Sequence, residues 1–133
     1  MKRVILCIDD EQMILTSLKS QLKRNFGKKF CYEFAENAQE GFKLVEELIH
    51  DDSVIIIIVS DWLMPGIKGD EFLIKIHETH PKIIKIMLTG MADNHAISNA
   101  QKNANLYHCI NKPWTENELV DVIRSGLKKL FLL

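Results

Sequence analysis

Short apolar segments that alternate with segments of helical periodicity restrict the fold of this chain more than any other feature. The strongest, residues 54–59, consists of six consecutive β-branched residues, which is typical of a strand buried on both faces of a parallel sheet. Three further apolar segments predict strands over residues 4–8, 83–88 and 106–110, and a weaker one predicts a strand over residues 30–34. The sequence therefore predicts five strands.

Apolar residues at three- and four-residue spacing predict five helices, one after each strand. They cover residues 12–25, a segment after Asn37, a segment around residues 72–76, residues 93–103, and a segment from Thr115 to about residue 130. Asn37 and Thr115 are suited to cap the second and fifth helices, and Glu118 stands at the reciprocal capping-box position. Gly27 is expected to end the first helix.

This alternation predicts an α/β fold, namely a doubly wound five-stranded parallel sheet flanked by five helices. The chain has 133 residues, so residues 1–133 are expected to form a single domain. Seventeen Lys and Arg against 18 Asp and Glu give a net charge of −1. No direct binding to nucleic acid or to an anionic membrane is therefore expected.

Cysteine usage and hydropathy indicate where such a protein would reside. The three cysteines form no CxxC pair, so neither a disulfide framework nor a zinc site is expected. The longest apolar run has six residues, far fewer than the roughly 20 that cross a bilayer. The expected location is the reducing cytoplasm.

Chemically reactive residues stand directly after four of the predicted strands. They are Asp9, Asp10 and Glu11 after the first strand, Asp61 after the third, Thr89 after the fourth and Lys112 after the fifth. Because the carboxyl ends of parallel strands meet at one edge of the sheet, these side chains are expected to converge. Carboxylates about 5 Å apart repel each other by roughly 3 kcal/mol at an effective dielectric constant of about 20, so the cluster needs a cation. All-oxygen ligands favour Mg²⁺, with Mn²⁺ as a substitute.

Four segments together have a family resemblance: residues 4–11 (VILCIDDE), 60–69 (SDWLMPGIKG), 87–90 (MLTG) and 111–114 (NKPW). With these segments in order, the chain resembles the receiver domain of bacterial two-component response regulators over essentially its whole length. The resemblance implies a flavodoxin-like sheet with strand order 2-1-3-4-5. It leaves open whether residues 1–133 are the N-terminal part of a longer regulator.

The resemblance also implies a phosphotransfer chemistry. Asp61 would take a phosphoryl group from the phosphohistidine of a sensor histidine kinase or phosphotransfer protein. Lys112, commonly held inward in this family by a cis bond to Pro113, would pair with the phosphoryl oxygens. Thr89 would form a hydrogen bond with them after a short movement toward the site.

A metal site and a switch surface are implied in the same way. Mg²⁺ would be held by the side chains of Asp10 and Asp61, by the backbone carbonyl of Leu63 and, mainly through water, by Asp9. Phosphorylation would change the surface formed by the fourth helix, the fifth strand and the fifth helix. Such a domain phosphorylates itself and turns over no external substrate, so it is not expected to be an enzyme in the usual sense.

Further partners implied by the resemblance are a second copy of the chain and an output domain, fused or separate. The alternative within signalling is a degenerate receiver that dimerises or acts as a scaffold without phosphate, and the intact set of Asp61, Thr89 and Lys112 argues against it. A phosphatase of the haloacid dehalogenase type would need a second aspartate where Leu63 stands. An FMN-binding protein would need a phosphate-binding loop after the first strand, where Asp10 and its acidic neighbours stand.

One position departs from the family pattern. Family members often have an aromatic residue three positions before the lysine, and its rotamer couples to the threonine. Cys109 occupies that position here, and Tyr107 is predicted on the same face of the strand because side chains alternate along it. A thiol cannot fill or vacate a pocket as a ring does, so the departure leaves this coupling open.

Overall fold

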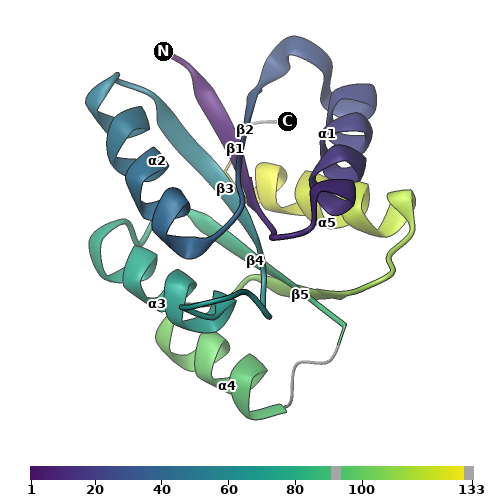
Figure 1. Ribbon diagram of the computed structural model, residues 1–133. Helices are drawn as coiled ribbons and strands as arrows, with labels where there is room; N and C mark the ends of the chain where they lie inside the picture. The colour runs from purple at the N-terminus through teal and green to yellow at the C-terminus, as the bar shows by residue number, and fades with distance from the viewer. Residues whose placement is uncertain (91–93, 131–133) are drawn as a thin grey trace.

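The computed structural model describes residues 1–90 and 94–130. Its centre is a five-stranded parallel sheet with strand order β2-β1-β3-β4-β5 (Figure 1). The strands are β1 (Arg3–Ile8), β2 (Cys31–Ala35), β3 (Val54–Asp61), β4 (Ile84–Thr89) and β5 (His108–Asn111). The helices are α1 (Gln12–Phe26), α2 (Ala38–His50), α3 (Gly69–Thr79), α4 (Asn94–Asn103) and α5 (Glu116–Lys129). The predicted doubly wound fold and the implied strand order are both confirmed.

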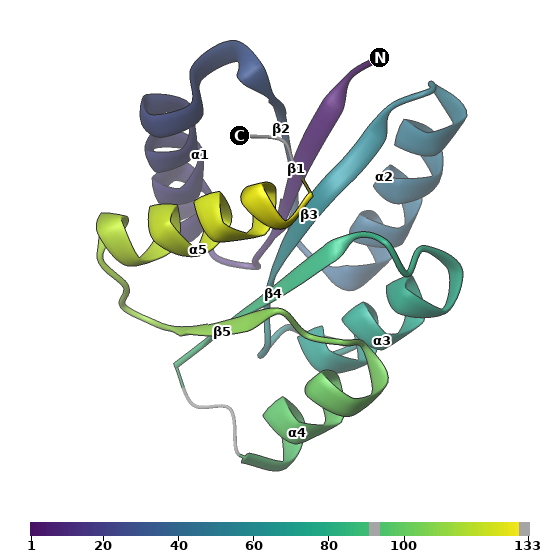
Figure 2. The same ribbon diagram turned by 180° about the vertical axis from the view of Figure 1, so that it is seen from behind.

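Helices cover both faces of the sheet, with α1 and α5 on one face and α2, α3 and α4 on the other (Figures 1 and 2). The central strand β3 shows why its sequence is apolar throughout. Ile57 packs with the residues of α1 and α5, whereas Ile58 packs with those of α2 and α3, and neither has any exposed surface. Burial on both faces accounts for the uninterrupted run of β-branched residues.

The helix ends follow the local chemistry that the sequence predicts. The side chain of Asn37 accepts a hydrogen bond from the backbone N–H of Glu40 at 2.8 Å, and Thr115 and Glu118 form the capping box of α5. Gly27 ends α1 with a positive φ of 58°, and a short 3₁₀ helix, η1 (Gly27–Lys29), follows that was not predicted. The predicted start of the fourth helix at residue 93 lies outside the described residues.

The prediction that Tyr107 shares a strand face with Cys109 is wrong. The strand β5 begins at His108, so the alternation rule does not extend to Tyr107. Its ring packs with the α1–α5 side, its hydroxyl contacts that of Ser125 on α5, and the Lys129 ammonium lies over the ring. Cys109 packs with the residues of the opposite face. The ring of Tyr107 is therefore not available to substitute for an aromatic residue at position 109.

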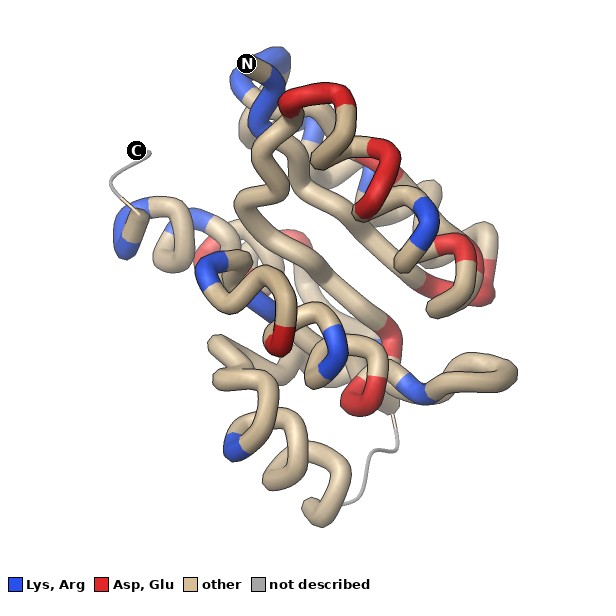
Figure 3. The backbone as a smooth tube through the Cα atoms, turned by 90° about the vertical axis from the view of Figure 1, so that its left-hand side faces the viewer, with Lys and Arg blue, Asp and Glu red and all other residues tan. Residues whose placement is uncertain are grey.

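Charged residues lie mainly on the helices and turns, as Figure 3 shows by the largely tan colour of the sheet. The strands contain four Lys, Arg, Asp or Glu residues in the described structure, namely Arg3, Glu33, Asp61 and Lys85. Of these, Asp61 and Lys85 are buried. Within residues 1–90 and 94–130, no helix combines the length and the apolar character that a membrane crossing requires.

Candidate functional site

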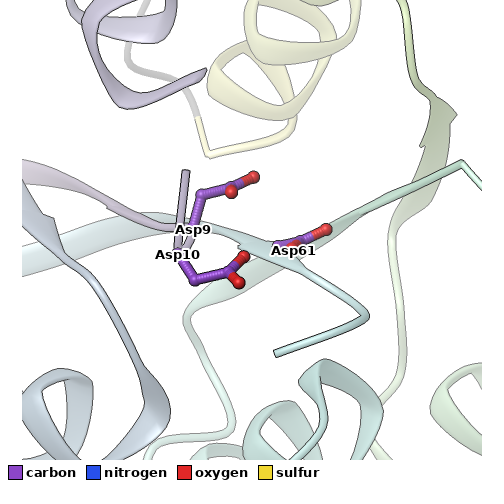
Figure 4. A group of neighbouring side chains, drawn as sticks. All are labelled: Asp9, Asp10 and Asp61. Atoms are coloured by element: carbon purple, nitrogen blue, oxygen red, sulfur yellow. The ribbon is translucent and has the colours of Figure 1, made fainter. Parts of the chain in front are cut away.

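Three carboxylates converge where β1 and β3 end. Asp9 and Asp10 directly follow β1, and Asp61 is the last residue of β3. Each contributes one oxygen to a group in which all three atoms lie within 4.8 Å of one another, and Figure 4 shows the three side chains extending to the same side. Asp9 has no exposed surface and Asp61 is 4% exposed, whereas Asp10 is exposed. The cluster therefore has two buried acids and one that faces solvent.

Lys112 completes this cluster from the end of β5. Its Nζ lies 2.7 Å from Oδ2 of Asp9 and 3.0 Å from Oδ1 of Asp61, with Oε1 of Glu11 at 3.7 Å. The peptide bond between Lys112 and Pro113 is cis, as the family resemblance implied. One ammonium thus faces three neighbouring carboxylates of the described structure, and negative charge remains in excess at this edge of the sheet.

Burial and, to a lesser extent, the neighbouring carboxylates raise the pKa values of the buried acids. Burial raises the pKa of Asp61 to about 6, against the lowering effect of its hydrogen bond with Lys112, and the charges of Asp9 and Asp10 raise it further. Burial also raises the pKa of Asp9, although Lys112 opposes the change. Burial disfavours the charge of Lys112 as well, but its hydrogen bonds with Asp9 and Asp61 outweigh that effect and raise its pKa. A second cation beside these oxygens would relieve the repulsion.

The cluster opens into a cleft of about 550 Å³. Its lining comprises Asp10, Glu11, Asp61, Trp62, Leu63, Met64, Pro65, Gly90 and Lys112. Leu63 is 57% exposed and lies in this lining, and its predicted role as a backbone ligand stays a prediction. Thr89 is 3% exposed and is not part of the described lining, but its backbone carbonyl accepts a hydrogen bond from the N–H of Lys112 at 2.9 Å. The structure thus brings all the predicted site residues to one edge of the sheet.

Gly69 lets α3 approach the end of β3 closely. Its N–H donates a hydrogen bond to the carbonyl of Trp62 at 2.7 Å. A Cβ atom at position 69 would lie 2.0 Å from the backbone oxygen of Asp61 and 2.8 Å from Cα of Trp62. A side chain at position 69 does not fit this backbone, so glycine is required for α3 to start this close to the end of β3.

Asp70, in the first turn of α3, is a residue of the site region that was not predicted. It is 7% exposed and accepts hydrogen bonds from Nε1 of Trp62 at 3.2 Å and from Nδ2 of Asn99 at 3.0 Å. An acidic residue at the start of a helix is ordinarily explained by the helix dipole alone. The sequence therefore held no signal that this carboxylate joins the cleft to α4.

Comparison with known proteins gives the same family as the motifs. Residues 5–124 match the response regulator receiver domain. The hydrogenase transcriptional regulatory protein HoxA of Cupriavidus necator is 29% identical over 124 residues, which cover 93% of this chain and 24% of that protein. The chain thus spans about a quarter of the length of that curated relative.

Two solved structures of receiver domains have the same fold as this chain and are 26–29% identical to it in sequence. The signal receiver domain of an HD domain-containing protein from Pseudomonas fluorescens Pf-5 has a TM-score of 0.85 at 26% identity, with 97% of each chain covered. A CheY-like response regulator receiver domain protein from Methanospirillum hungatei JF-1 has a TM-score of 0.83 at 29% identity, with 97% of this chain and 96% of that chain covered. With these matches and an acidic cluster in the place that the motifs predict, the chain belongs to the response regulator receiver domain family.

Proposed function

We propose that this receiver domain accepts a phosphoryl group on Asp61 with the help of Mg²⁺. The observation that supports it most is the position of Lys112, whose ammonium lies 3.0 Å from Asp61 and 2.7 Å from Asp9. A buried carboxylate beside a fixed cation, in a cleft that opens to solvent, is an arrangement suited to phosphoryl transfer. An Oδ atom of Asp61 would attack phosphorus as the P–N bond of a phosphohistidine breaks, giving an acyl phosphate and a histidine that takes up a proton.

The donor set fits a hard divalent cation. Carboxylates of Asp9, Asp10 and Asp61 offer oxygen ligands within 4.8 Å of one another, and Mg²⁺ prefers few protein carboxylates together with water and phosphoryl oxygens. Asp10 and Asp61 would hold the ion directly, the backbone carbonyl of Leu63 would add a third ligand, and Asp9 would act mainly through water. Mn²⁺ would serve in the same ligand set. When bound, the ion would supply positive charge where the phosphoryl oxygens gather.

Lys112 and Thr89 would act on the phosphoryl group from the neighbouring strands. Lys112 is already tied to Asp61, so its ammonium needs only to exchange one oxygen partner for another. Thr89 precedes the exposed Gly90 and would move toward the group to form a hydrogen bond with it. We infer that this movement alters the surface of α4, β5 and α5, since phosphorylation changes both charge and hydrogen-bonding capacity.

The expected partners follow from membership of the family. A sensor histidine kinase or a phosphotransfer protein would supply the phosphoryl group in the cytoplasm, and an output domain, fused or separate, would read the switch. A homodimer through α4 and α5 is a further expected assembly. The domain would turn over no substrate other than its own phosphodonor, so we do not expect it to be an enzyme beyond that self-phosphorylation.

Intact-mass spectrometry after incubation with acetyl phosphate, with and without Mg²⁺, tests the proposal. The wild-type chain is expected to gain one phosphoryl group only with Mg²⁺. Asp61→Asn should gain none, and Asp121→Asn, which removes an exposed acid of α5, should behave as wild type. If the folded wild-type chain gains no phosphoryl group from acetyl phosphate or from other small phosphodonors, the degenerate, phosphate-independent receiver becomes the better explanation.

A further inference from the structure

A chain of hydrogen bonds runs from the mouth of the acidic cleft to α4. Nε1 of Trp62 donates to Oδ1 of Asp70 at 3.2 Å, and Nδ2 of Asn99 donates to Oδ2 of Asp70 at 3.0 Å. Asn99 in turn accepts a hydrogen bond from Nδ2 of Asn103 at 2.8 Å. These hydrogen bonds connect Trp62, which follows β3, with the first turn of α3 and with α4.

Chemistry fixes the direction of these bonds. The indole N–H of Trp62 and the amide Nδ2 of Asn99 can only donate, so Asp70 accepts in both bonds. Asp70 is 7% exposed, and within residues 1–90 and 94–130 it forms no ion pair. A buried carboxylate without a cation depends on the N–H groups that face it. The carboxylate of Asp70 is therefore shared by two donors, Trp62 on the side of the cleft and Asn99 on α4.

The Trp62 end of this chain lies at the site itself. Trp62 follows Asp61 and lines the cleft. Its backbone N–H donates to the carbonyl of Leu88 at 2.9 Å, and its carbonyl accepts from the N–H of Gly69 at 2.7 Å. With the backbone fixed on both sides, the half-buried indole is the part of Trp62 that can respond to new charge or bulk in the cleft.

The Asn99 end lies on a helix with little charge of its own. In α4 the single Lys, Arg, Asp or Glu residue is Lys102, as the one blue segment of that helix in Figure 3 shows. The neighbouring strand β5 offers Cys109 rather than a ring, and Tyr107 faces α5. Among the described side-chain contacts, the bond from Asn99 to Asp70 is thus a direct polar link between α4 and the region of the cleft.

We propose that Asp70 is a positioning residue through which a change at Asp61 reaches α4. The inference rests on the proposed phosphorylation of Asp61 and names the route of its signal. A phosphoryl group adds negative charge beside the indole of Trp62. As the indole shifts, its N–H no longer donates to Asp70. The hydrogen bond from Asn99 to the carboxylate then becomes stronger. The α4 helix then changes its position or its dynamics relative to α3.

Hydrogen exchange of α4 in Asn99→Ala, with Gln101→Ala as the matched control, tests this route. Alanine favours helix more than asparagine does, so α4 itself is retained in both variants, and Gln101 is exposed on the same helix. All proteins would have Trp114→Phe, so that emission reports Trp62 alone. Hydrogen exchange of α4 and tryptophan emission are measured in Mg²⁺, with and without beryllofluoride as an analogue of the phosphoryl group. The gain in intact mass is measured separately, after incubation with acetyl phosphate.

The parent protein is the chain whose only substitution is Trp114→Phe. We expect this parent and its Gln101→Ala variant to show the same change in the hydrogen exchange of α4 when beryllofluoride is added. Asn99→Ala should retain the phosphoryl mass gain and the Trp62 emission change but lose more than half of the α4 change. Asp70→Asn leaves one acceptor oxygen for the two donors Trp62 and Asn99, and Asp70→Ala leaves none, so both variants should lose part or all of the α4 change. An Asn99→Ala chain with the full α4 change would overturn the inference.

The two proposals fail in different ways. If the parent gains no phosphoryl group, the proposed function fails and this inference falls with it. If the parent gains the group but its α4 exchange does not change, the proposed function stands and only the inference is overturned. Far-UV circular dichroism of each variant confirms that the comparison is made between folded proteins.

Discussion

Lys112 forms a 2.7 Å ion pair with Asp9, a carboxylate that has no exposed surface. The two residues belong to opposite ends of the chain and meet only because β1 and β5 both end at the same edge of the sheet. Lys112 also pairs with Asp61. Because one ammonium cannot neutralise two carboxylates, the site keeps a net negative charge.

Replacing Lys112 by alanine should destabilise the metal-free protein. Asp9 and Asp61 would lose their cation while buried, and we expect a loss of about 1–3 kcal/mol in the free energy of unfolding. Urea unfolding in the presence of a chelator measures this, with Lys102→Ala on the exposed face of α4 as the control. Mg²⁺ should stabilise Lys112→Ala more than wild type, because the variant has more uncompensated negative charge. An equal effect of Mg²⁺ on both would contradict this view of the site.

Mg²⁺ alone should stabilise the wild-type protein. A ligand that binds only the folded state at ten times its dissociation constant adds about 1.4 kcal/mol to the free energy of unfolding. Asp10→Asn should lose most of this gain, since Asp10 is the exposed member of the cluster and its replacement leaves the core intact. Thermal unfolding across a Mg²⁺ titration gives the result, and Asp121→Asn serves as the charge-matched control. A full Mg²⁺ response in Asp10→Asn would remove that residue from the ligand set.

Gly69→Ala should damage both stability and phosphorylation. The new Cβ would meet the backbone oxygen of Asp61 at 2.0 Å, so the start of α3 or the end of β3 must move, at a cost of about 1–3 kcal/mol or more. Gly90→Ala is the matched control for stability, because among the described residues its Cβ would meet no atom nearer than 3.9 Å. Urea unfolding and the rate of phosphoryl gain are both measured. The explanation fails if the two alanine variants are equally stable.

Lys85 should make stability rise with pH in the alkaline range. It is 1% exposed, and its Nζ donates to the carbonyl of Ile83 at 2.7 Å without forming an ion pair in the described structure. Burial lowers its pKa from 10.5 to about 8. Above pH 8 the folded chain has released this proton while the unfolded chain still binds it, so the free energy of unfolding increases with pH until the unfolded lysine also titrates.

The measurement for Lys85 is the difference between wild type and Lys85→Met. From about pH 7.5 to about pH 10, wild type should gain roughly 2 kcal/mol relative to the variant. Urea unfolding at several pH values gives both curves, and the subtraction removes the other groups that titrate in this range. A difference that is constant with pH would show that Lys85 keeps its ordinary pKa in the folded protein.

Sequence alone was sufficient for the sheet and for the convergence of the acids. Strands such as β3 are apolar on both faces, so they are visible without knowledge of their neighbours, and the edge rule for parallel strands then places Asp10 and Asp61 together. The position of Lys112 follows from the same rule. These predictions required only the order of elements along the chain.

Contacts between helices were not accessible in that way. The bond from Asn99 to Asp70 joins residues 29 positions apart, and it depends on which faces of α3 and α4 meet. Tyr107 was misplaced because the start of β5 decides whether the alternation of side chains applies to it. Lys85 would ordinarily be expected to face solvent, but a strand covered by helices on both faces gives it no route there.

The order of the strands also governs when the site becomes complete during synthesis. β1 pairs with β2 and β3, and thereafter each new strand adds beside the one before it, β4 to β3 and β5 to β4. A nascent chain that folds from its N-terminus can therefore bring Asp9, Asp10 and Asp61 together before Lys112 has left the ribosome. The three acids are synthesised before the lysine that pairs with two of them, so a chain that ends before β5 lacks the ammonium of Lys112.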